Sequence, residues 1–131
     1  MLQEHEKSLI RASVEALRNG LQGFTSRRPQ LEMMATVANA IGDCHEPEDT
    51  NRTGRNIAIV EAGTGTGKTL AYLIPAIVLA KSRGKHLIIS TSTIALQHQI
   101  TTKDLPLQRL LPVQFTAALA KGRARYVASQ N

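Results

Sequence analysis

Two stretches of helical periodicity come first along the chain. Apolar side chains recur every three or four residues over residues 3–19, which predicts an amphipathic helix that Gly20 ends. A second apolar face follows Pro29, a residue suited to the first turn of a helix, and stops at Gly42. The next segment, DCHEPEDTNRTGRN, is rich in acids, Pro, Gly and Asn and has no apolar periodicity. We expect a surface loop there.

From Ile57 the hydrophobic pattern changes to short continuous runs. Three of these runs are typical of buried parallel strands: IAIVE, HLIIST and VQFTAALA. A helical run over residues 68–81 separates the first two. A second helical run, TIALQHQI, and then a Pro-bounded loop separate the second from the third. Pro75 should kink or split the first of these helices. The alternation predicts right-handed βαβ units, an α/β fold with a parallel sheet flanked by helices. We divide the chain into N-terminal helices with an acidic linker, residues 1–55, and an α/β region, residues 56–131.

Composition narrows the class of protein. Hydrophobic residues make up 42% and charged residues 20%, which favours a globular chain over a disordered one. The net charge of +6 favours a polyanionic partner such as nucleic acid, although a solvated basic surface has the same composition. The single cysteine, Cys44, excludes an intrachain disulfide and a multi-cysteine zinc site. Because the chain has neither a signal-peptide pattern nor an apolar stretch of the ~20 residues that span a bilayer, we expect a cytoplasmic protein.

The candidate chemistry centres on AGTGTGKT, between a predicted strand and a predicted helix. The segment matches the phosphate-loop pattern, with Ala62 in place of the first glycine. Its glycines let successive N–H groups face phosphate oxygens, and the helix start adds its positive dipole end. Lys68 would reach the β- and γ-phosphates and the Thr69 hydroxyl would complete the Mg²⁺ shell, so both have the catalytic role. The predicted nucleotide site consists of Ala62, Gly63, Thr64, Gly65, Thr66, Gly67, Lys68 and Thr69.

Two neighbouring segments narrow the class of phosphate-loop protein. A glutamine side chain can pair with both a donor and an acceptor on adenine, so Gln30, with Arg28 beside it, is a candidate for base recognition. Hydroxyl groups also gather where the second predicted strand ends, a position that suits phosphodiester contacts. An N-terminal helix that packs on the sheet and a polar helix cap are the alternatives, and a kinase or transporter ATPase stays open on the phosphate loop alone. The hydroxyl residues are Ser90, Thr91, Ser92 and Thr93.

Taken in order, these segments resemble the DinG branch of the XPD-like superfamily 2 DNA helicases over residues 24–127. RRPQLEMM looks like the family's Q-type adenine motif, with Gln30 as the adenine-reading glutamine. EAGTGTGKTLAYLIPAI looks like motif I, and IISTSTIALQHQITTKDLP looks like motif Ia, with Gln97, Gln99 and the DLP that begins at Asp104. AKGRARYV looks like the basic segment that opens the family's iron–sulfur domain. The resemblance implies a phosphate-loop RecA-like domain, present here only in its first part.

The implied activity is that of an ATP-dependent DNA helicase with ATP and Mg²⁺ as cofactors. It would move 5′ to 3′ on single-stranded DNA and unwind duplexes or DNA–RNA hybrids. The Asp-Glu-x-His motif and the second domain with its arginine finger are absent from these 131 residues, so we expect the chain alone to bind ATP or DNA without turnover. The three basic residues among the expected DNA contacts also suit a solvated tail. The expected contacts are Ser90, Thr91, Ser92, Thr93, Gln97, Lys121, Arg123 and Arg125.

One position departs from the family pattern. The family's basic segment runs on from its tyrosine into the first of four cysteine ligands to an iron–sulfur cluster. Here Ala128 stands two residues after Tyr126, an alanine methyl cannot ligate iron, and Cys44 lies upstream of the phosphate loop. We therefore expect no iron–sulfur cluster. This departure resembles the CRISPR-associated type IV DinG-like helicases, whose partner would be a CRISPR effector complex; a DinG paralogue that lost its cluster, or an engineered Cys-to-Ala change, stays open.

Overall fold

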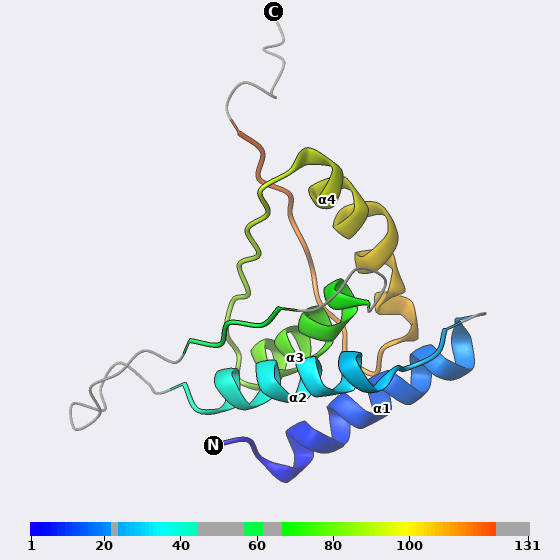
Figure 1. Ribbon diagram of the computed structural model, residues 1–131, viewed down its shortest axis with the longest axis vertical. Helices are drawn as coiled ribbons and strands as arrows, with labels where there is room; N and C mark the ends of the chain where they lie inside the picture. The colour runs from blue at the N-terminus through cyan, green and yellow to red at the C-terminus, as the bar shows by residue number, and fades with distance from the viewer. Residues whose placement is uncertain (22–23, 45–56, 62–66, 123–131) are drawn as a thin grey trace, which may run out of the picture.

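The computed structural model describes residues 1–21, 24–44, 57–61 and 67–122, and these residues contain only helices as regular elements (Figure 1). The four α-helices are followed along the chain by a π-helical segment, η1, and a 3₁₀ segment, η2. In chain order the elements are α1 (Glu4–Gly20), α2 (Arg28–Gly42), α3 (Lys68–Ser82), α4 (Ile94–Gln99), η1 (Ile100–Asp104) and η2 (Leu105–Leu110).

The first two helices form as the sequence predicts. In α1 the Gln3 backbone N–H donates to Glu6 Oε1 at 2.9 Å, and acidic residues in the first turn face the positive end of the helix dipole. In α2, Pro29 occupies the first turn, where its missing N–H costs no intrahelical hydrogen bond. Local signals set both helix starts.

Helix α3 is the centre of the fold, because both α1 and α2 pack against it. Its side chains from Ala71 to Leu79 are buried at every position except Tyr72. The helix continues through Pro75, so the predicted split does not occur; packing on several sides offsets the hydrogen bond that proline removes. Each large apolar side chain in this core contributes about 1.5–3 kcal/mol. The core residues are Ile10, Val14, Leu17, Met34, Ala38, Leu73, Ile74, Ile77, Val78, Leu79, Ile100, Leu111 and Val113.

One arginine joins three helices at the far end of α3. Arg83 Nε lies 2.8 Å from Glu6 Oε2, and an Nη of the same guanidinium lies 3.0 Å from Glu6 Oε1. The other Nη donates to the carbonyls of Ile41 and Gly42 at 3.4 and 3.2 Å, where α2 ends. A cation at a helix C-terminus faces the negative end of its dipole, so Arg83 holds the start of α1 and the end of α2 together.

The predicted parallel sheet is not found in the described part of the chain. Residues 57–61, 86–91 and 113–120 were predicted as strands, yet none of them is assigned as a strand. Ile57, Ile59 and Ile88 are 74%, 93% and 90% exposed, whereas strands of a covered sheet bury such side chains. The apolar runs indicate a preference for burial, but a strand exists only where a neighbouring strand completes its hydrogen bonds.

The remaining sequence expectations about architecture have mixed outcomes. Helix α4 lies where TIALQHQI predicted a helix, and the Pro-bounded loop after it contains η1 and η2. The proposed division between residues 55 and 56 falls outside the described residues, although α1 and α2 share one core with α3. Among the described helices, none is both long and apolar enough to cross a membrane.

Candidate nucleotide-binding site

Gly67 is the last glycine of the predicted phosphate loop and the N-cap of α3. Its backbone adopts φ 73° and ψ 39°, the left-handed conformation that glycine accepts at least cost, and its carbonyl accepts from Ala71 N at 3.1 Å. Lys68 and Thr69 therefore lie in the first turn of α3, where backbone N–H groups lack intrahelical acceptors. Such a turn is suited to a phosphate group. The other predicted loop residues, Ala62, Gly63, Thr64, Gly65 and Thr66, lie outside the described residues.

The structure brings Gln30 to this turn. Its side-chain Nε2 donates to the Gly67 carbonyl at 3.2 Å, and the residue is only 4% exposed. Its Oε1 is buried and has no hydrogen-bond partner among the described residues. Two segments that the sequence placed in one nucleotide site thus meet across 37 positions of chain. The orphaned oxygen is an acceptor, and the exocyclic amino group of adenine is a donor that fits it.

Arg28 does not share this environment. Its Nε pairs with Glu32 Oε1 at 2.9 Å along α2, and its side chain is 90% exposed. An exposed i,i+4 ion pair of this kind contributes little to stability. In this structure Arg28 belongs to the outer surface of α2.

The hydroxyl cluster lies at the start of α4. Thr93 is the N-cap, and its Oγ1 accepts from Leu96 N at 3.2 Å. The Thr91 hydroxyl donates to the Thr93 carbonyl at 3.4 Å, whereas Ser90 and Ser92 are exposed. Thr93 therefore has the alternative role considered for this cluster, that of a polar helix cap. It leaves the two serines open to a ligand.

Helix α4 also contacts the segment that precedes the basic end of the chain. Gln97 Nε2 donates to the Ala120 carbonyl at 3.1 Å, and Figure 1 shows the segment that leads to Ala120 crossing the chain just before α4 begins. Lys121 follows directly, so one of the predicted basic DNA contacts lies beside predicted motif Ia. Arg123 and Arg125 lie outside the described residues, as do Tyr126 and Ala128.

Two further polar residues, Tyr72 and Asp104, were not among the predicted site residues. Tyr72 lies one turn beyond Thr69 in α3. Burial raises the pKa of the Tyr72 hydroxyl most strongly, and the charge of Asp104 also raises it, whereas a hydrogen bond with the Thr69 side chain lowers it. Asp104 ends η1, and burial raises the pKa of its carboxyl against the lowering effects of Gln99 and Lys103. The i,i+3 spacing from Thr69 could have identified Tyr72. No local signal links Asp104 to it.

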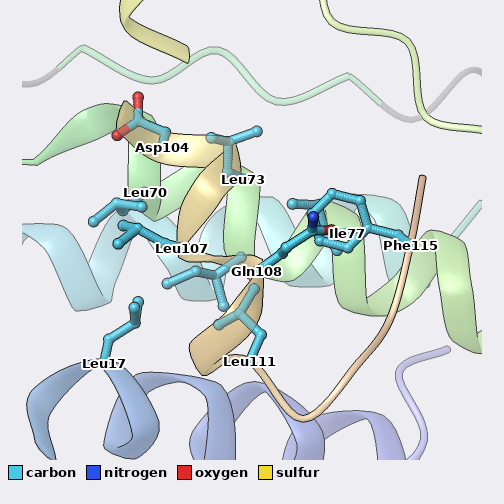
Figure 2. Close-up of a pocket in the computed structure, with 10 residues that line it drawn as sticks. Leu17, Leu70, Leu73, Ile77, Asp104, Leu107, Gln108, Leu111 and Phe115 are labelled. Carbon is cyan, nitrogen blue, oxygen red and sulfur yellow. The ribbon is translucent and has the colours of Figure 1, made fainter. Parts of the chain in front are cut away.

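A small apolar cavity lies between α3, η2 and Leu17 of α1 (Figure 2). Its volume of about 10 Å³ is enough for roughly one water molecule, and most of its lining side chains are leucine or isoleucine. It is a small packing gap in the hydrophobic core and is far too small for a nucleotide. Figure 2 shows Asp104 at its edge, with the carboxylate oxygens directed away from Leu107 and Leu111.

Comparison with known proteins decides the family. The model of the DEAD/DEAH box helicases matches residues 26–122, which include Gln30, the phosphate loop, α4 and Lys121. The chain belongs to the DEAD/DEAH box helicase family. Membership implies a RecA-like phosphate-loop fold and the use of ATP and Mg²⁺, and it confirms the coarse part of the fold prediction, although strands are not assigned in the described residues.

Individual relatives refine the resemblance. The chain is 45% identical to the ATP-dependent DNA helicase DinG of Salmonella choleraesuis and 44% identical to that of Escherichia coli, over 127 residues in each case. It is 43% identical over 128 residues to DinG of Photobacterium profundum. These alignments cover 95–96% of this chain but only 16–18% of the relatives. The expected resemblance to DinG-type helicases is confirmed.

The described residues fit an Mg²⁺-bound nucleotide. Gln30 Oε1 is an orphaned buried acceptor beside Gly67, and Thr69 is a half-buried hydroxyl in a helix's first turn. Lys68 is exposed in the same turn, where an ammonium group can reach a phosphate. A buried amide acceptor, a helix start suited to phosphate and a hydroxyl suited to Mg²⁺ thus lie at Gly67 or within two residues of it along α3.

Proposed function

We propose that the whole protein is an ATP-dependent DNA helicase of the DinG type, and that this chain supplies its N-terminal ATP-binding portion. The observation that carries this proposal is the contact between Gln30 and Gly67. A candidate base-recognition residue in contact with a candidate phosphate-binding turn supports a site for a purine nucleotide. The names of the similar proteins support DNA as the substrate.

In the proposed site, residues of α2 and of α3 bind different parts of ATP. Gln30 accepts from the adenine amino group through Oε1, the acceptor that lacks a partner among the described residues. The phosphates lie against the N–H groups of the first turn of α3, with Lys68 neutralising their charge and Thr69 holding Mg²⁺. When held by Thr69, Mg²⁺ would supply positive charge that offsets the negative charge on the terminal phosphate. The chain's own residues orient the nucleotide for that step.

DNA contacts would come from the start of α4 and from the segment that Gln97 contacts. The exposed Ser90 and Ser92 precede α4, and Lys121 follows the residue that Gln97 holds. Hydroxyl and ammonium groups suit contacts with the backbone phosphates of single-stranded DNA. The guanidinium groups of Arg123 and Arg125 suit the same contacts. We propose that this surface binds single-stranded DNA during 5′ to 3′ translocation and unwinding of duplexes or DNA–RNA hybrids.

The first prediction tests the role of Lys68 in the whole protein. Lys68→Ala should reduce ATP hydrolysis at least ~100-fold, because it removes the cation that faces the transferred phosphate. Unwinding should be lost with it, while helical circular dichroism stays unchanged. Lys81→Ala is the matched control, since Lys81 is an exposed lysine in the last turn of the same helix. Hydrolysis by Lys68→Ala at the rate of the Lys81 variant would contradict the proposal.

The second prediction concerns iron. Because Ala128 stands where the family places a cluster cysteine, we propose that the protein has no iron–sulfur cluster and that a CRISPR effector complex is a candidate partner. The purified whole protein should be colourless, without visible iron–sulfur absorbance or stoichiometric iron. A brown preparation with about four iron atoms per chain would refute this expectation.

Binding without turnover is a second candidate function for these residues by themselves. The base and phosphate contacts proposed above involve only Gln30 and the first turn of α3. A nucleotide-binding module is therefore the smaller function that these 131 residues support.

A further inference from the structure

The side chain of Gln97 joins α4 to a segment that lies 23 positions later in the chain. Its Nε2 donates to the Ala120 carbonyl at 3.1 Å, and Lys121 comes next in the sequence. An amide nitrogen carries two hydrogens, and this contact uses one of them on the protein's own backbone. The sequence alone suggested that Gln97 contacts DNA, whereas the structure gives its amide a partner within the chain.

The segment that Gln97 contacts has little apolar burial of its own. Val113 is buried and Phe115 is half-buried against the core, but every residue from 116 to 122 is exposed. Side-chain burial therefore fixes the path of this segment as far as Phe115 and contributes little after it. A hydrogen bond to the Ala120 backbone holds the chain at a point that burial does not reach.

The backbone of Gln97 is itself held on both sides. Its N–H donates to the Thr93 carbonyl at 3.2 Å, and its carbonyl accepts from Thr101 Oγ1 at 3.1 Å. Ile100, which follows α4, is only 5% exposed and ties this end of the helix to the core. A side chain on a fixed backbone loses less freedom when it forms a contact. Gln97 is thus a firm support for the exposed segment.

The same hydrogen bonds extend to the hydroxyl cluster before α4. The Thr93 carbonyl, which accepts from Gln97 N, also accepts from the Thr91 hydroxyl at 3.4 Å. The two exposed serines of the cluster flank Thr91 in sequence. Helix side chains lean toward the N-terminal end of their helix, which brings the Gln97 amide and its partner toward the same end of α4 (Figure 1). Lys121 is therefore linked to the serines through Gln97.

We propose that Gln97 is a positioning residue for single-stranded DNA: it holds the Ala120 carbonyl so that the Lys121 ammonium group and the two serine hydroxyls contact the backbone of one strand. The inference rests on the proposed function, because it needs DNA on this surface. It assigns to Gln97 a role in placing a cation in advance, which reduces the ordering that DNA binding would otherwise require. The charge that contacts the phosphate belongs to Lys121.

The test measures DNA affinity of the whole protein against salt. Binding of a fluorescent oligothymidylate is followed by anisotropy over a series of NaCl concentrations. Gln97→Met keeps the side-chain length and removes the donor. It should weaken binding roughly 3- to 10-fold and flatten the dependence of log Kd on log [NaCl] by about 0.7, the share of one phosphate contact on a single strand. Lys121→Ala should have the same two effects. Gln108→Met is the matched control, because Gln108 is also half-buried but lines the core cavity.

A double-mutant cycle separates positioning from direct contact and from a general loss of structure. In a Lys121→Ala background, Gln97→Met should cause no further loss, because the group that it positions is already gone. Additive losses would show that Gln97 contacts DNA itself or supports more than Lys121, and they overturn the inference. Unchanged binding in either single variant overturns it as well. If the unmodified protein does not bind the oligonucleotide, the proposed function fails instead.

Discussion

At Gly67 the backbone has a positive φ of 73°, and the place that a Cβ would occupy is taken by the amide of Gln30. A side chain there faces two independent costs, one from the left-handed backbone and one from the collision. Gly84 offers a natural comparison, because its φ is 62° but nothing lies within 4 Å of its Cβ position. The pair allows the two costs to be measured separately.

We therefore predict that Gly67→Ala destabilises the chain more than Gly84→Ala does. The Gly84 variant should lose about 1–2 kcal/mol of unfolding free energy through the backbone alone. The Gly67 variant should lose a further ~1–3 kcal/mol because Gln30 must move. Urea unfolding followed by helical circular dichroism measures both losses. In a Gln30→Ala background the extra loss should disappear, and equal losses for the two glycine variants would contradict the role of Gln30.

The candidate site was predictable from sequence only where a motif carries its own chemistry. Gln30, Lys68 and Thr69 have recognisable spacing, and the structure places Gln30 against the turn that leads into the other two. Tyr72 and Asp104 have no such motif in a single sequence. The position of Asp104 depends on how η1 packs on α3, which is a property of the fold, whereas Tyr72 lies three residues after Thr69 in the same helix.

At the scale of the helices, the ion pair between Glu6 and Arg83 links α1 to the end of α3. The hydrogen bond from Arg83 lowers the pKa of Glu6 most strongly, burial opposes it, and the Gln3 backbone N–H assists, so the pKa falls from 4.5 to about 2. The folded state thus holds the ionised form more strongly than the unfolded chain does. The corresponding stability is fully present above pH 4.5 and is lost as the pH falls toward 2.

Our prediction for this ion pair is that Glu6→Gln destabilises the chain by roughly 3 kcal/mol at pH 7, the equivalent of the pKa shift. The loss should shrink as the pH falls from about 4.5 toward 2, because the unmodified chain then loses the same charge. Urea midpoints measured across this range give the difference. Glu4→Gln is the matched control, since Glu4 forms an exposed pair with Lys7 in the same turn and should change little. A constant difference at every pH would show that the ion pair is not its cause.

Helix prediction succeeded where periodicity and end signals agreed, and it failed where two effects competed. The starts of α1 and α2 follow from their first-turn residues. Pro75 was expected to kink or split α3, and the split does not occur, because burial on several sides keeps the helix continuous. The turns of η1 and η2 were predicted as loop, because a π-helical turn has no periodicity that a short sequence reveals.

At the scale of the whole molecule, the predicted parallel sheet shows that strand pairing cannot be predicted from a single sequence. The apolar runs at residues 57–61, 86–91 and 113–120 indicate that these side chains favour burial. They do not say which backbone will lie beside them. Ile59 and Ile88, each at least 90% exposed, show the result: hydrophobic pattern without a neighbouring strand produces extended chain. The family match supplies the RecA-like fold that the described residues do not display.

The ion pair of Glu6 with Arg83 also sets an order of events during protein synthesis. The two residues are 77 positions apart, so at about 5–20 residues per second Arg83 is made roughly 4–15 s after Glu6. Throughout that interval the Glu6 carboxylate lacks its arginine partner, and burying the charge would be unfavourable. The carbonyl groups at the end of α2 likewise lack the hydrogen bonds from the Arg83 guanidinium until Arg83 has been synthesised. The first two helices to leave the ribosome can therefore complete their docking only when the end of the third arrives.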